Sequence, residues 1–345
     1  MRSGRMDDYM TIKLITALVL SFLFATAFGK YYIPWLLKQK MGQEIKEYVT
    51  WHTGKSGTPT MGGLIFILGV TVACLTVGFE PMLHGDFIHI YVLIFAGVFG
   101  FIGFLDDWEK LKKKQNLGLT ARAKFLLQLA AAMVFILLMR KLGYIRPNLY
   151  VPFFNKTIPM PEWLYLIFAA FVITGTVNAV NITDGIDGLA TGTSLPVFMF
   201  FSLISLLWGR NYESLGIFAS GITGALIGFL VYNFNPAKCF MGDTGSLFLG
   251  GAVAAMAFAY DMPLILITLG FMYIIETMSD IIQVGYFKLS HGKRVFKMAP
   301  FHHHLEMGGW TGKKWKEKEL FVLFTGISLL MAVISFIGVF YRYPV

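Results

Sequence analysis

The chain has 345 residues, of which 56% are hydrophobic and only 14% are charged, and its mean hydropathy is +0.64. Water-soluble domains carry about 25% charged residues, so this composition excludes an ordinary soluble enzyme and indicates an integral membrane protein. The net charge of +9 does not indicate a nucleic-acid partner, because the basic residues cluster between apolar runs. The two cysteines have neither the spacing of a disulfide framework nor that of a zinc site.

Ten apolar segments predict ten transmembrane helices and therefore an all-α, polytopic fold with one domain, residues 1–345. They lie near residues 12–36, 61–79, 88–105, 121–142, 163–181, 189–208, 214–233, 245–260, 262–287 and 320–341. The first is preceded by Arg2 and Arg5 and contains a sequence that resembles a signal cleavage site. Its apolar character continues to Leu37, so we expect a retained helix rather than a cleaved signal.

The basic residues predict the orientation of these helices. Most of the 29 Lys and Arg residues fall in the first, third, seventh and ninth connections, which ten crossings place on one side. We expect that side to be cytoplasmic and both termini to be extracytoplasmic. The longest outer connection, residues 143–162, contains four prolines among aromatic and apolar residues, and it predicts a small hairpin.

The first polar motif is the pair Asp106-Asp107, followed by Lys110, at the end of an uncharged apolar run. Two adjacent carboxylates repel each other, so one must be protonated, meet a cation or reach water. Mg²⁺ prefers such oxygen ligands and often bridges to substrate phosphates. The simpler interpretation is a solvated helix end.

The second motif, NAVNITDGIDGLA, occupies residues 178–190. Asn178, Asn181 and Asp184 recur every three residues, so on a helix they would share one face, and Asp187 would extend the row. Such polar groups at the end of an apolar helix are unfavourable without partners, which favours a binding site over polar packing between helices.

Two further motifs follow apolar helices. NFNPAKCFMGDTGS, residues 233–246, predicts a shaped loop that holds Asp243, although an ordinary turn remains open. The run PFHHHLE, residues 300–306, contains three adjacent histidines. Zinc binding is one interpretation, but neighbouring side chains rarely reach one ion, so we favour hydrogen bonding to phosphate.

The segment around Lys55 contains Gly-Lys-Ser but lacks the first glycine of a P-loop, because position 49 is Val49. Its Gly/Thr-rich continuation to Gly63 can still offer backbone N–H groups to an anion. The ninth apolar segment carries Glu276, Asp280 and Gln283 on one face, where structural pairing and catalysis both remain open. All of these motifs except the Glu276 row fall in the inner connections, which predicts a single cytoplasmic site for a nucleotide diphosphate and a lipid acceptor.

Together these motifs closely resemble those of the phospho-N-acetylmuramoyl-pentapeptide-transferase (MraY) family, within the polyprenyl-phosphate N-acetylhexosamine-1-phosphate transferase superfamily. The resemblance rests on the GTPTMGG segment at 57–63, the aspartate pair, and the motifs at 178–190, 233–246 and 300–306. It implies transfer of phospho-N-acetylmuramoyl-pentapeptide from its UDP donor to undecaprenyl phosphate, giving lipid I and UMP in peptidoglycan synthesis. It also implies Mg²⁺, a homodimer and a cytoplasmic active site in the bacterial inner membrane.

The resemblance also implies roles for individual residues. Asp243 would be the main Mg²⁺ ligand, and Asp106 and Asp107 would bind or deprotonate the lipid phosphate or help to hold the metal. The residues expected to line the nucleoside pocket are Asn181, Asp184, Asp187, Asn233 and Phe240, with Phe240 stacking on uracil. Those expected around the phosphates and sugar are Lys55, Thr60, Lys110, Lys124, Gln283 and the catalytic candidate His303, with His302 and His304 supporting that wall. Asn178 is expected among the substrate-binding residues without a more specific role.

Other functions remain open from the sequence. A secondary transporter would also explain intramembrane carboxylates, but transporter sites usually lie near the midplane at a repeat interface, and no repeat is evident. A transferase that uses another UDP-amino sugar is the closest enzymatic alternative. The reaction itself could be a direct displacement by the lipid phosphate, which we favour, or a double displacement through an aspartyl adduct.

Overall fold

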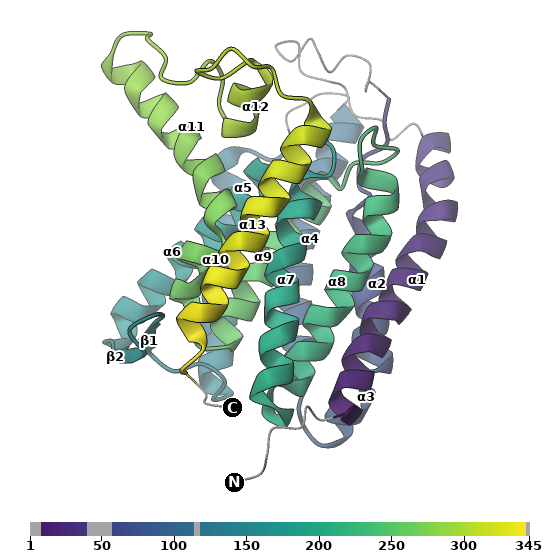
Figure 1. Ribbon diagram of the computed structural model, residues 1–345. Coiled ribbons are helices and arrows are strands. Elements are labelled where there is room, and N and C mark those ends of the chain that lie inside the picture. The colour runs from purple at the N-terminus through teal and green to yellow at the C-terminus, as the bar shows by residue number, and fades with distance from the viewer. Residues whose placement is uncertain (1–7, 40–56, 114–117, 343–345) are drawn as a thin grey trace.

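The computed structural model describes residues 8–39, 57–113 and 118–342, and it shows a helical bundle with one small two-stranded sheet (Figure 1). The elements are α1 (Asp8–Lys38), α2 (Gly63–Thr76), α3 (Phe79–Leu83), α4 (Ile88–Lys113), α5 (Ala121–Lys141), β1 (Asn148–Val151), β2 (Lys156–Pro159), α6 (Glu162–Thr183), α7 (Leu189–Trp208), α8 (Glu213–Asn233), α9 (Gly242–Ala259), α10 (Leu266–Leu269), α11 (Phe271–Leu289), α12 (Phe301–Glu306) and α13 (Glu317–Val339). Short 3₁₀ turns precede α8 and α10.

The helices confirm a multi-pass membrane protein. Within the described ranges, eight helices are long and apolar enough to span a bilayer, and α10 with α11 makes a ninth if the bent pair is one span. Each of the ten expected segments contains a helix, but α2 has only 14 residues, fewer than the roughly 20 that a straight span needs. The α10–α11 pair bends by 81°.

The predicted hairpin is present. Strands β1 and β2 pair antiparallel, with Asn148 opposite Pro159 and Val151 opposite Lys156. The backbone N–H of Phe153, in the turn, donates to the Gly338 carbonyl of α13 at 2.7 Å. Figure 1 shows the hairpin at the same end of the bundle as the start of α1 and the end of α13, whereas α12 lies at the other end.

Helix α9 lies in the core of the bundle, and 16 of its 18 residues are buried. Its small residues explain this position, because they let neighbouring backbones approach closely. A Cβ on Gly250 would lie 2.5 Å from the Cα of Val177 in α6. A Cβ on Gly103 in α4 would lie 2.0 Å from the backbone carbonyl oxygen of Asp243. Burial on all sides accounts for the glycine-rich composition of this helix.

We expect Gly103→Ala to lower the thermal unfolding temperature of the detergent-solubilised protein, because the added methyl group meets the backbone of α9 rather than a movable side chain. Overpacking of this kind typically costs about 1–3 kcal/mol. The matched control is Gly97→Ala in the same helix, where no described heavy atom lies within 4 Å of the new Cβ. Gly97→Ala should unfold at the wild-type temperature or above it, since Ala favours the helix. Equal unfolding temperatures for the two variants would refute the close α4–α9 contact.

Candidate active site

Three carboxylates from two distant motifs meet at one end of the bundle. Asp106 and Asp107 lie near the end of α4, and Asp243 is the second residue of α9. One oxygen of each lies within 4.8 Å of the others, and this is the only such His, Cys, Asp and Glu group among the described residues. The two α4 aspartates are each 3% exposed. This proximity confirms that the two motifs converge, as predicted. An all-oxygen set at this spacing suits a hard divalent cation such as Mg²⁺.

Asp107 also caps the beginning of α9. Its Oδ2 accepts hydrogen bonds from the backbone N–H of Thr244 at 2.9 Å and from the Thr244 hydroxyl at 2.7 Å. Its Oδ1 accepts from the backbone N–H of Asp243 at 3.1 Å. The first N–H groups of a helix have no partner within the helix, and a carboxylate there is also favoured by the helix dipole. A residue of α4 thus supplies the cap that α9 lacks in its own sequence.

Two lysines balance the charge of the carboxylates. Lys110 Nζ lies 2.7 Å from Asp106 Oδ2 and 2.8 Å from Asp243 Oδ2. Lys124 Nζ, from the first turn of α5, lies 2.8 Å from the same Asp243 oxygen. The ammonium groups therefore occupy part of the space around the carboxylates, and a bound cation would share these ligands with them. The same cations are suited to phosphate oxygens.

The remaining oxygens of the cluster are held by polar neighbours. The Asn181 amide donates to Asp243 Oδ1 at 2.8 Å and to Ser246 Oγ at 2.7 Å. The backbone N–H of Leu119 donates to Asp106 Oδ1 at 2.9 Å. These contacts fix the carboxylate orientations before any ligand arrives, as a preorganised site requires.

The GTPTMGG segment pairs with the loop that precedes α9. The backbone N–H of Phe240 donates to the Pro59 carbonyl at 2.9 Å, and the N–H of Gly62 donates to the Phe240 carbonyl at 2.8 Å. Thr60 lies beside Gly242, since a Cβ there would be 2.7 Å from the Thr60 hydroxyl. The structure thus brings Thr60 and Phe240 to the carboxylate cluster. Lys55 lies outside the described residues.

The polar row predicted for residues 178–187 does not extend to Asp187, because α6 ends at Thr183. Asn178 does not face the carboxylates but donates to Gln128 of α5 at 2.7 Å. Asp187 turns toward the next loop, where its Oδ2 accepts from the Asn235 amide and the Ala237 N–H, each at 2.9 Å. Gly188 has a φ of 74°, and this left-handed backbone ends any helical continuation.

Asp184 follows the last residue of α6 and remains beside the cluster. Its pKa is raised well above its usual value by burial and by the negative charges of Asp243, Asp107 and Asp187. A carboxyl group with a raised pKa near other carboxylates is a candidate for binding or transferring a proton. Asn233, another predicted pocket residue, is 1% exposed, accepts from the Thr191 hydroxyl at 2.8 Å and donates to the Cys239 carbonyl at 3.0 Å. Asn233 therefore stabilises the loop between α8 and α9.

The three histidines form α12, and each has a different environment. His302 is fully buried, with its Nδ1 2.8 Å from Glu276 Oε2 of α11 and its Nε2 close to Gly185. His303 Nδ1 lies 2.6 Å from Glu306 Oε2. His304 accepts from the backbone N–H of Lys297 at 3.1 Å and packs edge-on against a tryptophan. Zinc binding by the histidine run is therefore not supported, whereas the role of the run in phosphate binding stays a prediction.

Gln283 has a structural contact that the sequence did not suggest. Its Oε1 accepts from the backbone N–H groups of Val295 and Phe296, at 3.2 and 3.0 Å. These two hydrogen bonds hold the loop between α11 and α12. Its predicted contact with substrate stays a prediction.

Several residues at the site were not singled out from the sequence. Thr244, Ser246 and Asn235 belong to the quoted loop motif, but their hydrogen-bonding roles depend on which helix approaches them. Gln128 carried a usable signal, since it is a lone amide in the apolar part of α5. Glu317, whose Oε2 accepts from the Asp187 N–H at 3.0 Å, had no signal because 130 residues separate the two.

Comparison with known proteins places this arrangement in a family. The family model Glycosyl transferase family 4 matches residues 89–261, and the phospho-N-acetylmuramoyl-pentapeptide-transferase signature 1 matches residues 55–67. The phospho-N-acetylmuramoyl-pentapeptide-transferase of Caldanaerobacter subterraneus subsp. tengcongensis is 44% identical over 95% of this chain and 99% of its own length. The chain belongs to the phospho-N-acetylmuramoyl-pentapeptide-transferase family.

Other members of the family are similarly related. The phospho-N-acetylmuramoyl-pentapeptide-transferase of Halalkalibacterium halodurans is 42% identical over 93% of this chain and 96% of its own length. That of Listeria monocytogenes serotype 4b is 40% identical over 93% of this chain and 97% of its own. These matches confirm the family that the motifs suggested, and they argue against a transporter.

We expect Glu276→Gln to destabilise the protein in a pH-dependent way. Burial alone lowers the pKa of His302, but the Glu276 carboxylate outweighs it and raises the pKa above 6.5. The folded state then binds the proton more tightly than the unfolded state does. This stabilisation is complete below pH 6.5 and is lost as the pH rises through the raised pKa.

The unfolding temperature should therefore differ most between wild type and Glu276→Gln below about pH 6.5, and the difference should shrink toward alkaline pH. Thermal unfolding in detergent across pH 5 to 9 measures this. Glu162→Gln, which removes the Arg140 contact (2.9 Å) at the other end of the bundle, serves as the control and should show no such trend. A constant difference across this pH range would contradict the pairing of Glu276 with a protonated His302.

Proposed function

We propose that the chain transfers phospho-N-acetylmuramoyl-pentapeptide from its UDP donor to undecaprenyl phosphate and releases UMP, forming lipid I at the bacterial cytoplasmic membrane. The observation that carries this proposal is the buried cluster of three aspartates and two lysines at one end of the bundle in a member of this family. Two phosphorylated substrates must meet there without repelling each other, which requires this concentration of cation-binding and cationic groups.

In the direct displacement, a phosphate oxygen of the lipid acceptor forms a bond to the β-phosphorus of the donor. The bond between that phosphorus and the oxygen bridging to the α-phosphate breaks, and UMP leaves with the electron pair. Lys110 and Lys124 bind phosphate oxygens and neutralise the developing charge, while Asn181 keeps Asp243 oriented. Asp243, Asp106 and Asp107 would hold Mg²⁺, which when bound supplies positive charge to the diphosphate.

The contacts of Asp107 favour the direct route over an aspartyl adduct on that residue. Both of its oxygens accept hydrogen bonds from the first turn of α9. Attack on phosphorus by either oxygen would remove the cap of a buried helix. Asp106 is held by Lys110 and by the Leu119 N–H. The lipid phosphate, in contrast, arrives as an anionic oxygen nucleophile and needs no such rearrangement.

The donor is expected to lie along the loops around the cluster. Asp184, Asp187, Asn233 and Phe240 belong to the predicted nucleoside pocket, with Phe240 next to the GTPTMGG segment supporting that placement. The residues predicted to contact the sugar or phosphates are Thr60, Gln283, His302, His303 and His304, together with Lys55. A homodimer is part of the same proposal.

The proposed topology has ten crossings, with the carboxylate cluster cytoplasmic and both termini extracytoplasmic. Support comes from the basic residues near the site and from Figure 1, in which the start of α1 and the end of α13 lie at the same end of the bundle as the hairpin, away from α12. In this topology α2 crosses with help from α3, and α10 with α11 forms one broken crossing.

A membrane-impermeant maleimide should label Lys156→Cys in β2 from outside intact spheroplasts. It should label Lys293→Cys, in the loop before α12, only after permeabilisation. Both positions are exposed, and the native Cys74 and Cys239 are fully buried, so background labelling should be low. The wild-type chain is the control. Labelling of Lys293→Cys in intact spheroplasts would invert the proposed topology.

Asp243→Asn should lower Mg²⁺-dependent UMP release by about a hundredfold or more, because one site of charge stabilisation is lost at the reacting phosphates. Expression and unfolding temperature should stay near wild type, since the amide keeps the size of the side chain. Asp86→Asn is the matched control, because Asp86 binds Ser214 and the Ile88 N–H outside the carboxylate cluster. UMP release from the UDP donor with undecaprenyl phosphate measures the effect. Wild-type turnover by Asp243→Asn would refute the assignment.

A further inference from the structure

The β1–β2 hairpin has one face that packs on the bundle and one that is exposed and apolar. Tyr150 of β1 is buried on the inner face, where the guanidinium carbon of Arg342 lies 4.2 Å from the centre of its ring. Ile158 of β2 pairs with Leu149, so the alternation of side chains along a strand places both on the opposite face. Half of Ile158 is exposed. The outer face of the hairpin therefore presents hydrocarbon to its surroundings.

The turn of the hairpin extends this apolar surface. Phe154 is 74% exposed and Phe153 is 52% exposed. Phe153 and Asn155 have φ angles of 67° and 47°, in the left-handed region that is uncommon for residues other than glycine. Contacts with the end of α13 hold this shape, because the Phe153 N–H binds the Gly338 carbonyl at 2.7 Å and the Asn155 amide donates to the Tyr341 carbonyl at 3.3 Å. The bundle thus fixes the turn in a conformation that leaves Phe154 exposed.

Both ends of the hairpin are attached where transmembrane helices begin or end. Only Met160 and Pro161 separate β2 from α6, so the end of the strand lies within about 10 Å of the start of that helix. The turn binds Gly338, one residue before α13 ends at Val339. Figure 1 shows the hairpin at the side of the bundle. It therefore lies along the membrane boundary and does not extend from it into water.

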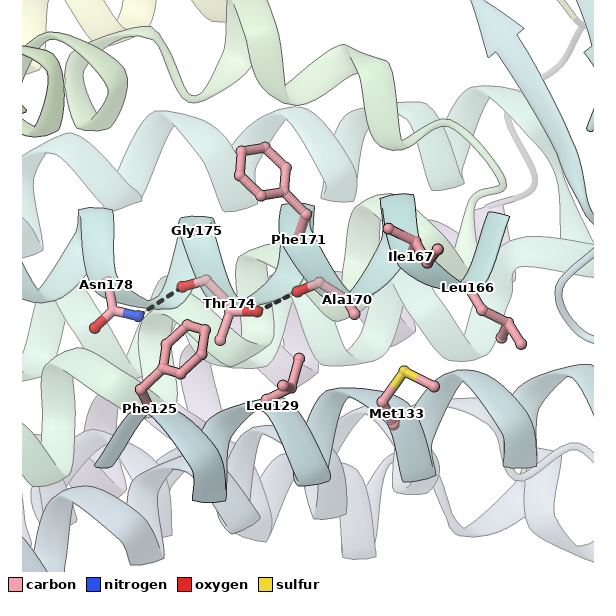
Figure 2. A pocket seen from close by; sticks show the side chains of 10 residues that line it. All are labelled: Phe125, Leu129, Met133, Leu166, Ile167, Ala170, Phe171, Thr174, Gly175 and Asn178. Carbon is pink, nitrogen blue, oxygen red and sulfur yellow. Dashed lines mark hydrogen bonds between the residues drawn. The ribbon is translucent and has the colours of Figure 1, made fainter. Parts of the chain in front are cut away.

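The length of α6 gives the same depth. Glu162 and Asn181 are about 28 Å apart along the helix, close to the roughly 30 Å thickness of the hydrocarbon core. Asn181 binds the carboxylate cluster, which the proposed function places at the cytoplasmic boundary. The start of α6 then lies at the outer boundary. Exposed apolar side chains continue from the hairpin along α6 through Trp163, Ile167 and Phe171, the last two of which are drawn in Figure 2.

We propose that the β1–β2 hairpin is an interfacial anchor, which inserts Phe153, Phe154 and Ile158 among the phospholipids of the outer leaflet. The inference rests on the proposed function only for the choice of leaflet. Apolar side chains at this depth enter the boundary between headgroups and acyl chains. Lys156, which is exposed in the same hairpin, can keep its ammonium among the lipid phosphates while its stem lies on the apolar surface.

The size of the surface favours lipid over a protein partner. Three side chains of this size offer at most about 750 Å² even when fully exposed. Each partner in a stable protein complex buries roughly 800 Å², whereas insertion into a lipid boundary requires no minimum area. The hairpin also continues the lipid-facing surface of α6, so phospholipid already surrounds its base.

A nitroxide on Phe154→Cys measures the depth of the turn. Cys74 and Cys239 are fully buried, so the label attaches to the introduced cysteine, and the treated wild-type chain gives the background. The full chain is reconstituted in vesicles of phosphatidylethanolamine and phosphatidylglycerol. Collisions of the label with oxygen, which concentrates in hydrocarbon, are compared with those of a nickel chelate that stays in water. The references are Asn211→Cys in the 3₁₀ turn before α8, for water, and Leu330→Cys in the middle of α13, for hydrocarbon.

We expect the Phe154→Cys label at a depth of about 5–10 Å inside the phosphate level, between the two references. Ile158→Cys, on the same surface, provides an independent position and should give the same result. Labels as accessible to the nickel chelate as that on Asn211→Cys would overturn the inference. Protection of the labels from both oxygen and nickel would overturn it too, because it would show that protein covers the hairpin.

The depth measurement separates this inference from the proposed function, since it requires neither turnover nor a known orientation. UMP release is measured on the unlabelled wild-type chain in the same vesicles. Absence of UMP release with both labels in the lipid boundary would refute the proposed function and leave the anchor established. UMP release with both labels in water would refute the anchor and leave the proposed function standing.

Discussion

The capping of α9 by Asp107 is the contact on which the site depends. Three hydrogen bonds join one carboxylate of α4 to the first turn of a helix buried on all sides. Without that carboxylate, N–H groups at the start of α9 would be buried without acceptors, which is strongly unfavourable in a membrane protein. The same contact places Asp243 beside Asp106 and Asp107. The feature that stabilises the fold therefore also assembles the three carboxylates that we propose to hold the metal.

Close packing and charge balance make this contact possible. Because Gly103 has no side chain, the α4 backbone can approach that of Asp243 closely. This packing brings the three carboxylates together in spite of their mutual repulsion. Lys110 then bridges Asp106 and Asp243, and Lys124 approaches Asp243 from α5. Each lysine is a mobile counter-ion, because its long side chain can turn from a carboxylate to a phosphate oxygen without moving a helix. The cluster can thus stay compact in the absence of substrate and still accept anionic ligands.

The sequence predicted the helices, the hairpin, the polar motifs and their meeting at one end of the bundle. Hydrophobic length and the spacing of basic residues contain that information, since bilayer thickness and insertion depend on them directly. It did not predict that Asp187 would leave the face of α6 and turn toward Asn235. Residues three apart share a face only while the helix continues. After α6 ends, Asp187 instead binds the loop at Asn235 and Ala237, about 50 residues away in the sequence. Nor did the sequence predict that the Gln283 side chain would accept hydrogen bonds from the loop between α11 and α12.

The composition of α5 and α6 follows from the two phases in which the substrates dissolve. A nucleotide sugar reaches the protein from water, whereas a polyprenyl chain stays in the hydrocarbon of the bilayer, so the reacting atoms must meet at the boundary. Both helices change between polar and apolar residues near the carboxylate cluster: α5 passes from Lys124 to Phe125, and α6 passes from apolar turns to Asn178 and Asn181. A site deeper in the bundle would have to desolvate the diphosphate, and one farther out would have to pull the chain into water. In the proposed topology, the end of the bundle where Asp107 caps α9 lies at this boundary, where both penalties are smallest.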